Sequence, residues 1–370
     1  MKHKEIHNLD QLQVLLADTK EINRYAFTNI DFGKVEAKLE GCIFKNCIFL
    51  GCNLPATFRY IIEENNLVMP KINVPFNVYR AELYTATDLY GDITNKDFLF
   101  ENTYDQKVYR NYLKHGKGIS ADVGIKEALA RTLHDNSISD ALHDFISNIP
   151  EKKIVGIMGG HGLPRTEVGY LNVALIAKTL TEKGYLMVTG GGPGAMEATH
   201  LGAWMAGRSL QELEEAVNII KVAPTFKDKG WLEVTFKVIE KYPQTKYNSL
   251  GIPTWLYGHE PSTPFATHIA KYFDNSIRED GILTIAKGGI IYTPGSAGTM
   301  QEIFQDGAQN HYKTFGYASP MVFFGVDYWT KQMPAYNLLS SLMESGKYKN
   351  LILSISDSID EVVGEIEKFC

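Results

Sequence analysis

Short apolar runs alternate with helical patterns along the chain from Lys152 to its end. The runs have the length of buried strands, and strands that alternate with helices at this spacing predict right-handed β–α–β units. We therefore predict an α/β fold with a doubly wound, Rossmann-like parallel sheet. The strands are expected at residues 154–158, 186–189, 218–223, 254–257, 289–292, 321–326 and 351–355. The helices are expected at residues 166–183, 195–206, 231–241, 265–286, 299–311, 335–344 and 359–369.

A five-residue repeat marks the N-terminal part of the chain. The repeated positions are bulky at Leu39, Phe44, Phe49 and Leu54, and small two residues earlier, at Ala37, Cys42, Cys47 and Cys52. This pattern is typical of a pentapeptide-repeat β-helix, in which both kinds of side chain point inward. We expect such a strip over about residues 26–55, packed on another element because stacked repeats need neighbours. We interpret the cysteines, including Cys370, as small core residues. A metal site is the alternative, although neither CxxC pairs nor a histidine at ligand spacing is present.

The region before Lys152 has a mixed character. We expect a short amphipathic helix over residues 8–20, then the strip, and an irregular segment over residues 66–93. Helices follow over residues 122–134 and 139–147, and Asn148-Ile149-Pro150 ends the second of them. We predict two domains: an N-terminal mixed extension over residues 1–150 and the α/β domain over residues 151–370.

The composition excludes several classes of protein. The 370 residues carry a formal net charge of −6, and 44% of them are hydrophobic, which is ordinary for a globular chain and excludes a disordered or fibrous one. A mildly acidic chain argues against nucleic acid as a partner. No window approaches the ~18 uninterrupted apolar residues of a membrane helix, and no signal-peptide core follows the N-terminus. We expect a cytoplasmic protein with no membrane partner.

Three glycine-rich turns join an expected strand to an expected helix, at residues 159–162, 190–194 and 295–298. In a parallel sheet these turns lie at the carboxyl edge, where ligands bind. Glycine lets a ligand approach the backbone closely, and the unpaired N–H groups at a helix start attract an anion. The three turns together predict a ligand that carries phosphate. None has the spacing of a Walker P-loop or a dinucleotide fingerprint, so ATP and NAD are not the first candidates.

The second and third turns belong to longer motifs. Residues 294–302 read PGSAGTMQE and resemble the PGGxGTxxE motif of the LOG family, while residues 190–198 read GGGPGAMEA and are similar to that family's GGGPGxMEA loop. Arg278, in the sequence NSIR before the third turn, matches the position of the family's active-site arginine. The resemblance covers about residues 152–370. It implies a Rossmann-like nucleotide-binding domain that acts as a nucleoside 5'-monophosphate phosphoribohydrolase.

This activity would hydrolyse the N-glycosidic bond of a nucleotide such as AMP to free base and ribose 5-phosphate. Positive charge develops on the ribose as the bond breaks, so a carboxylate beside the anomeric carbon stabilises the transition state and can activate water. We expect Glu302 to be this carboxylate and Arg278 to hold Glu302 or the substrate. The phosphate is expected at Gly295, Ser296, Ala297, Gly298 and Thr299. The ribose and base are expected at Gly159, Gly160, Gly190, Gly191, Gly192, Gly194, Met196 and Glu197.

The sequence leaves an alternative open for each role. Glu302 could serve only the helix dipole, Arg278 could pair with Asp274 one turn earlier, and Met196 could fill the core. Two residues depart from the family motif. Ser296 replaces a glycine, which is tolerated only where φ is not positive, and Glu279 replaces a basic residue, which leaves the substrate open. The alternative function is a non-catalytic nucleotide sensor or carrier.

We expect neither a cofactor nor a metal, because no HExxH motif and no clustered set of His and Cys residues appears. A pyridoxal enzyme is rejected, since nothing near Lys287 supports a Schiff base. His161, His259 and His268 lie near expected loop ends, where a lone histidine is interpreted as a structural residue. The family resemblance implies a homodimer or higher homo-oligomer.

Overall fold

The computed structural model describes residues 3–56, 58, 65–92, 98–117, 123–244 and 246–369. The chain divides into two compact units. The first unit comprises Met1–Leu83 and Asn111–Asp144, and the second comprises Tyr84–Arg110 and Phe145–Cys370. The boundary expected at residue 150 stays a prediction. Cys370 and two ends of expected segments, Ile93 and Asp122, lie outside the described residues.

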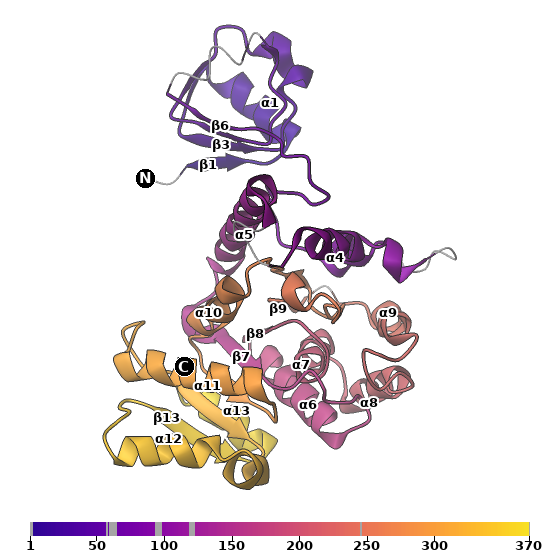
Figure 1. Ribbon diagram of the computed structural model, residues 1–370, viewed down its shortest axis with the longest axis vertical. Helices are drawn as coiled ribbons and strands as arrows, with labels where there is room; N and C mark the ends of the chain where they lie inside the picture. Colours follow the sequence, from indigo (N-terminus) through magenta and orange to yellow (C-terminus); the bar gives the residue numbers. More distant parts are fainter. Residues whose placement is uncertain are drawn as a thin grey trace. The chain divides into compact units, whose positions relative to one another are not determined.

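The first unit is built on short parallel strands, of which Figure 1 labels β1, β3 and β6. Strands β1, β3, β5 and β6 form one sheet, and β2 pairs with β4 in another. Phe27 of β3 pairs with Phe49 of β5, which pairs with Val68 of β6, so equivalent side chains stack from strand to strand. The strands are β1 (Lys4–Ile6), β2 (Glu21–Asn23), β3 (Tyr25–Thr28), β4 (Ile43–Lys45), β5 (Ile48–Leu50) and β6 (Leu67–Met69).

Aromatic rings fill the interior of the first unit. The cluster comprises Phe27, Phe32, Phe44, Phe49 and Phe58, all at most 5% exposed. Helix α1 (Leu9–Asp18) begins at Asn8, whose side chain accepts a hydrogen bond from the Gln11 amide at 2.9 Å. This N-cap satisfies an otherwise unpaired amide at the helix start. The apolar face of α1 belongs to the same core, through Leu12, Leu15 and Leu16.

The five-residue repeat coincides with this core in most positions. The bulky positions Leu39, Phe44, Phe49 and Leu54 are buried, as are Cys42 and Cys47. Cys52 is half-buried, and Ala37 is exposed within the 3-10 helix η1 (Phe32–Lys38). The Cys47 thiol lies 3.5 Å from the carbonyl oxygen of Ile22. The identification of the segment as a pentapeptide-repeat β-helix stays a prediction.

One long helix replaces two expected ones. α5 runs without interruption over Ile125–Ile146, where the sequence predicted helices over residues 122–134 and 139–147. The residues between the two expected helices, at 135–138, are mostly polar. However, Ile138 is fully buried, and the Ser137 hydroxyl donates to the carbonyl oxygens of Leu133 at 2.9 Å and Val78 at 3.2 Å. Burial therefore outweighs the weak helix propensity of the intervening residues.

The second unit contains a seven-stranded parallel sheet in the order β10-β9-β8-β7-β11-β12-β13. The central strands β7, β8 and β11 are buried along their whole length, which explains their uninterrupted apolar sequences. The chain is thus an α/β protein, as predicted. The strands are β7 (Ile154–Met158), β8 (Leu186–Thr189), β9 (Ser249–Gly251), β10 (His268–Ile269), β11 (Ile290–Tyr292), β12 (Pro320–Phe324) and β13 (Ile352–Ser356).

The strand order reverses between β7 and β11. From β7 the chain moves through β8 and β9 toward one edge, and from β11 it moves through β12 toward the other. Right-handed crossovers then place the connecting helices on opposite faces. Consistently, α6 packs on α7 and α13, while α11 packs on α10 and α12. The helices are α6 (Val168–Glu182), α7 (Ala195–Trp204), α8 (Leu210–Ile220), α9 (Trp231–Lys241), α10 (Asn275–Ile285), α11 (Ala297–Tyr312), α12 (Ala335–Glu344) and α13 (Ile359–Glu367).

Three predictions between β8 and β11 are wrong. Residues 218–223 were expected to form a strand but end α8, whose start is fixed by a capping box between Ser209 and Glu212. Residues 254–257 were expected to form a strand, but Trp255–Tyr257 is a 3-10 helix. The helix expected over residues 265–286 is confined to α10, and its first part contains β10. Short apolar runs do not distinguish a buried strand from the end of a helix.

The segment Tyr84–Arg110 completes one edge of the second unit. Tyr84 and Ile269 exchange backbone hydrogen bonds of 2.9 and 2.7 Å, which adds an antiparallel bridge beside β10. Helix α4 (Tyr104–His115) supplies Asp105, which is fully buried and pairs with Lys271. The indole of Trp255 donates to the same carboxylate at 3.0 Å. These contacts explain why this part of the predicted N-terminal extension belongs to the second unit.

Candidate functional site

The three glycine-rich turns meet at the point where the strand order reverses. The Gly160 amide donates to the carbonyl oxygen of Pro294 at 3.0 Å, and the Ala195 amide donates to the carbonyl oxygen of Gly160 at 3.1 Å. The first turn is therefore bonded to both of the others. A switch point at the carboxyl edge of a parallel sheet is where such folds bind ligands. The expected site residues, although distant in sequence, are brought together there.

The third turn presents the start of α11. Gly295 and Thr299 are buried, whereas Ser296, Ala297 and Gly298 are exposed. Ser296 has φ −109° and is the N-cap of α11, so the replacement of glycine costs no backbone strain at this position. Its side chain makes no capping hydrogen bond. The first amides of a helix point away from it and attract anions, so this turn can receive a phosphate.

Glu302 lies one turn into α11 and is half-buried. Burial raises the pKa of its carboxyl group from 4.5 to about 7; Arg278 opposes this rise and Glu279 adds to it. Removing a carboxylate from water disfavours its charged form. A carboxyl group that titrates near neutral pH can both accept and donate a proton during a reaction. The environment of Glu302 is therefore suited to general acid–base chemistry.

Arg278 projects from α10 toward the second turn. Its Nε donates to the carbonyl oxygen of Ile252 at 3.0 Å, and its Nη1 lies 3.7 Å from Oε1 of Glu279. The carboxylate of Asp274, the alternative partner, accepts a hydrogen bond from the Ser276 amide as the N-cap of α10. The side chain of Arg278 is about one-tenth exposed. Its charge therefore acts in a partly desolvated setting, where it is less screened than on the surface.

Glu279 links α10 to α11. Its carboxylate accepts hydrogen bonds from Asn275 at 2.7 Å and from Gln301 at 2.7 Å. Gln301 immediately precedes Glu302. The acidic residue that departs from the family motif thus lies on α10 beside Arg278 and is hydrogen-bonded to the residue that precedes Glu302 on α11.

The conformation of the second turn requires glycine at two positions. Gly191 and Gly194 have φ values of +69° and +70°, a region that disfavours other residues. At Gly194 a Cβ atom would also collide with the backbone of Gly160 and His161. Met196 is half-buried and lies against Gly190 and Gly192. The glycines therefore serve the close approach of one turn to another, as well as any ligand.

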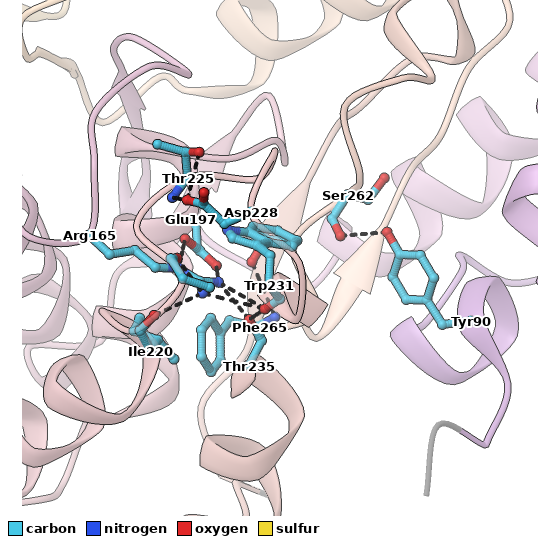
Figure 2. Close-up of polar contacts among 12 residues, drawn as sticks. Tyr90, Arg165, Glu197, Ile220, Thr225, Asp228, Trp231, Thr235, Ser262 and Phe265 are labelled. Atoms are coloured by element: carbon cyan, nitrogen blue, oxygen red, sulfur yellow. Dashed lines mark hydrogen bonds and ion pairs between the residues drawn. The ribbon is translucent and has the colours of Figure 1, made fainter. Parts of the chain in front are cut away.

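Glu197 is fully buried and pairs with a residue that the sequence reasoning missed. Its two carboxylate oxygens accept hydrogen bonds from Nε of Arg165, at 2.9 Å, and from Nη2. Arg165 also donates to the carbonyl oxygens of Ile220 and Trp231 and to the hydroxyl of Thr235 (Figure 2). It donates to the carbonyl oxygen of Ala223 as well. Both carboxylate oxygens of Glu197 are thus engaged by Arg165. No short motif contains Arg165, so only the fold brings it to α7.

A cavity of about 180 Å³ adjoins the first two turns. His161 and Gly194 contribute to it from the turns, and Glu197 from α7. The segment between α8 and α9 contributes Phe226 and Lys227, which the sequence reasoning also missed, and Trp231 at the start of α9. His161, expected to be structural, is exposed, and its Nδ1 lies 3.8 Å from Oε1 of Glu260.

Within the described ranges, one acidic group places its oxygens close enough together to hold a metal ion: Glu5, Asp140 and Asp144. It belongs to the first unit and includes none of the expected site residues. A search of the described residues for a helix long and apolar enough to cross a membrane found none.

Comparison with solved structures finds matches that span 58% of this chain. A molybdenum cofactor binding protein from Rippkaea orientalis is 16% identical, with a TM-score of 0.37 and 95% of its length covered. The protein TM1055 is 20% identical, with a TM-score of 0.38 and 98% of its length covered. The molybdenum cofactor carrier protein of Chlamydomonas reinhardtii is 14% identical, with a TM-score of 0.36 and 97% of its length covered.

No protein-family model matches the chain, and a comparison with curated proteins found no match. At TM-scores below 0.5 the structural likeness carries no functional assignment. The α/β fold is established by the parallel sheet and its strand order.

Proposed function

We propose that the chain binds a nucleoside 5'-monophosphate such as AMP at the carboxyl edge of the sheet and hydrolyses its N-glycosidic bond. The observation that carries this proposal is the position of Glu302, which is half-buried one turn into the helix whose N-terminus presents the third turn. Burial there also raises the pKa of its carboxyl group to about 7. The phosphate on Ser296–Thr299 amides would bring the ribose toward this carboxyl group. The motif resemblance to the LOG family supports the same assignment, together with Arg278.

In the proposed reaction one bond of the substrate breaks, and Glu302 and Arg278 have separate roles. The bond from the anomeric carbon to the base nitrogen breaks, and positive charge develops on the ribose. Ionised Glu302 stabilises this charge and takes a proton from water, whose oxygen bonds to the anomeric carbon. The proton that Glu302 takes from water then passes to the departing base nitrogen, so Glu302 is ionised again and one water is consumed overall. Arg278 helps to hold Glu302 ionised, since its charge opposes the rise in the pKa of that carboxyl group.

The direct test is incubation of the purified protein with AMP, GMP, CMP and UMP, followed by chromatography for free base and an assay for ribose 5-phosphate. Turnover with at least one nucleotide supports the proposal. Glu302→Gln should then lose turnover by a factor of about 100 or more while nucleotide affinity stays within a few-fold, because general acid–base catalysis contributes on that scale. Absence of both products with all four nucleotides would contradict the proposed hydrolase activity.

A non-catalytic nucleotide sensor or carrier is the second candidate, and Glu279 favours it. This carboxylate lies 3.7 Å from Arg278 and offsets part of the positive charge that would otherwise act on Glu302 or on a bound nucleotide. A sensor would show a nucleotide-dependent increase in melting temperature without release of base.

The homodimer or higher homo-oligomer implied by the resemblance stays a prediction for light scattering to test.

A further inference from the structure

The cavity beside the first two turns has walls that no glycine-rich motif contains. Phe226, Lys227 and Trp231 come from the segment that joins α8 to α9, and they face His161 and Gly194 across about 180 Å³. Trp231 is buried, Phe226 is half-buried, and Lys227 is exposed. At about 180 Å³ the cavity is smaller than the pocket of a whole drug-sized ligand, and its aromatic side chains offer a face on which a flat ring can stack.

The α8–α9 segment is held in place by buried polar contacts. Arg165 donates to the carbonyl oxygens of Ile220 at 3.2 Å, just before the segment, of Ala223 at 3.3 Å, within it, and of Trp231 at 3.4 Å, just after it. Figure 2 shows the contacts with Ile220 and Trp231 converging on one guanidinium group, with Glu197 beside it. The wall of the cavity is therefore anchored to Arg165, which follows the first turn, and through Glu197 to α7.

A local turn fixes the tip of the same segment. The carboxylate of Asp228 accepts hydrogen bonds from the amide of Thr225 at 2.7 Å and from its hydroxyl at 2.9 Å. These contacts close the backbone around Phe226 and Lys227, the two residues between them. A preformed wall binds with a smaller loss of conformational entropy than a mobile one.

The cavity lies one residue from the proposed phosphate turn. Gly160 donates its amide to Pro294 at 3.0 Å, and the next residue, His161, lines the cavity. The first turn therefore contacts the start of the third turn through one residue and borders the cavity through the next.

Lys227 places a positively charged side chain at the cavity wall. Its ammonium group lies 5.8 Å from the centroid of the Phe226 ring and carries hydrogen-bond donors alone. An oxo group on a ring stacked against Phe226 would accept from it, whereas an amino group at the same position would present a second donor. Hydrogen bonds to a charged donor are among the stronger ones, and their mismatch is costly.

We propose that this cavity is the base subsite and that it selects 6-oxopurine nucleotides, with Phe226 covering the ring and Lys227 donating to the oxo group. The inference depends on the proposed nucleotide site. It assigns Phe226 and Lys227 to specificity, and it assigns Arg165 and Glu197 to positioning, since their buried contacts hold the wall. IMP and GMP are then the preferred ligands, ahead of AMP.

The test is calorimetric titration with IMP, AMP and ribose 5-phosphate in the Glu302→Gln background, so that nucleotide is not consumed. The parent should bind IMP at least tenfold more tightly than AMP. Lys227→Met should remove this preference by weakening IMP about tenfold, and Phe226→Leu should weaken both nucleotides about fivefold or more. Neither variant should change the affinity for ribose 5-phosphate. Lys229→Met is the matched control, because Lys229 carries the same charge two residues away and does not line the cavity.

Results that contradict the base subsite can be distinguished from results that contradict the nucleotide site as a whole. Equal or tighter binding of AMP by the parent, or unchanged nucleotide affinity in both variants, would overturn the base subsite while leaving the nucleotide site intact. Equal weakening of all three ligands would also overturn it, because the variants would then act on the phosphate or the fold. If neither nucleotide nor ribose 5-phosphate binds the parent, the proposed function fails and the subsite fails with it. Melting curves of each variant show whether it is folded.

Discussion

The guanidinium group of Arg278 occupies the space beside Gly190 that a Cβ atom on this glycine would need. The two residues come from different parts of the unit, α10 and the turn after β8. Gly190 does not adopt a positive φ, so the requirement for glycine here is steric. The second turn thus supports the expected catalytic arginine directly, and its sequence constrains the position of a side chain that belongs to another helix.

Gly190→Ala should displace Arg278 and lower catalytic efficiency. The methyl group would overlap Nη2 of Arg278 and the sulfur of Met196, and both side chains must move to admit it. A displacement of about 1 Å in a positioning group costs on the order of 100-fold in rate, so we expect kcat/KM to fall by roughly 10- to 100-fold. Steady-state kinetics with the preferred nucleotide measures this.

Gly281→Ala is the matched control for that variant. Gly281 lies on α10, as Arg278 does, and a methyl group added there would meet no atom within 4 Å outside its own stretch of helix. Alanine favours the helix over glycine by about 0.5–1 kcal/mol, so this variant should be slightly more stable and equally active. Equal activity in Gly190→Ala would show that the position of Arg278 does not matter to turnover.

Glu302→Gln should stabilise the fold at pH 8 and leave it nearly unchanged at pH 4. Between the ordinary pKa of 4.5 and the raised value of about 7, folded Glu302 keeps a proton that the unfolded chain has released. The free energy of unfolding therefore falls as pH rises through this window and stays low above it. Glutamine removes the penalty, which is about 1–3 kcal/mol. Urea denaturation at several pH values checks the slope; a pH-independent difference would contradict it.

The rate should follow the same ionisation. As a base, Glu302 must be deprotonated, so kcat/KM should rise with pH and level off above about 7. Glu279→Gln removes a negative charge that adds to the rise in the pKa of Glu302, and should move this inflection to lower pH. A pH–rate profile of the parent and Glu279→Gln provides the comparison. An inflection that stays in place in the variant would contradict a role for Glu302 as the titrating base.

The sequence predicted the strands that end at the three turns because each is a continuous apolar run closed by glycine. Ile154–Met158 and Leu186–Thr189 lie where they were expected. The region between β8 and β11 was mispredicted since its strands have only two or three residues, too few for a periodic signal. The helix that ends at Ile220 has an apolar last turn, which has the appearance of a strand in isolation.

Some residues of the candidate site could be predicted from the sequence, and others could not. Glu302 and Arg278 could be predicted because they belong to motifs with fixed spacing. In the folded chain, α10 and α11 bring the two side chains close enough for the charge of Arg278 to oppose the rise in the pKa of Glu302. Arg165 could not be named, because its contacts with Ile220, Trp231 and Glu197 depend on three elements that meet only in the folded chain. Phe226 was missed for the same reason, because it lines a cavity whose other residues, such as His161 and Gly194, are distant in the sequence.

Arg165→Met should destabilise the second unit strongly. The pair that Arg165 forms with Glu197 is buried on both sides, and the substitution leaves an unpaired carboxylate and three carbonyl oxygens without their donor. Breaking a buried pair by removing one partner costs about 3–5 kcal/mol. Urea denaturation followed by tryptophan fluorescence measures this, since Trp231 packs against the guanidinium at 4.6 Å. Lys331→Ala, which breaks an exposed pair with Asp327, is the control and should change little. A comparably small effect in Arg165→Met would show that the α8–α9 segment is held by its apolar contacts instead.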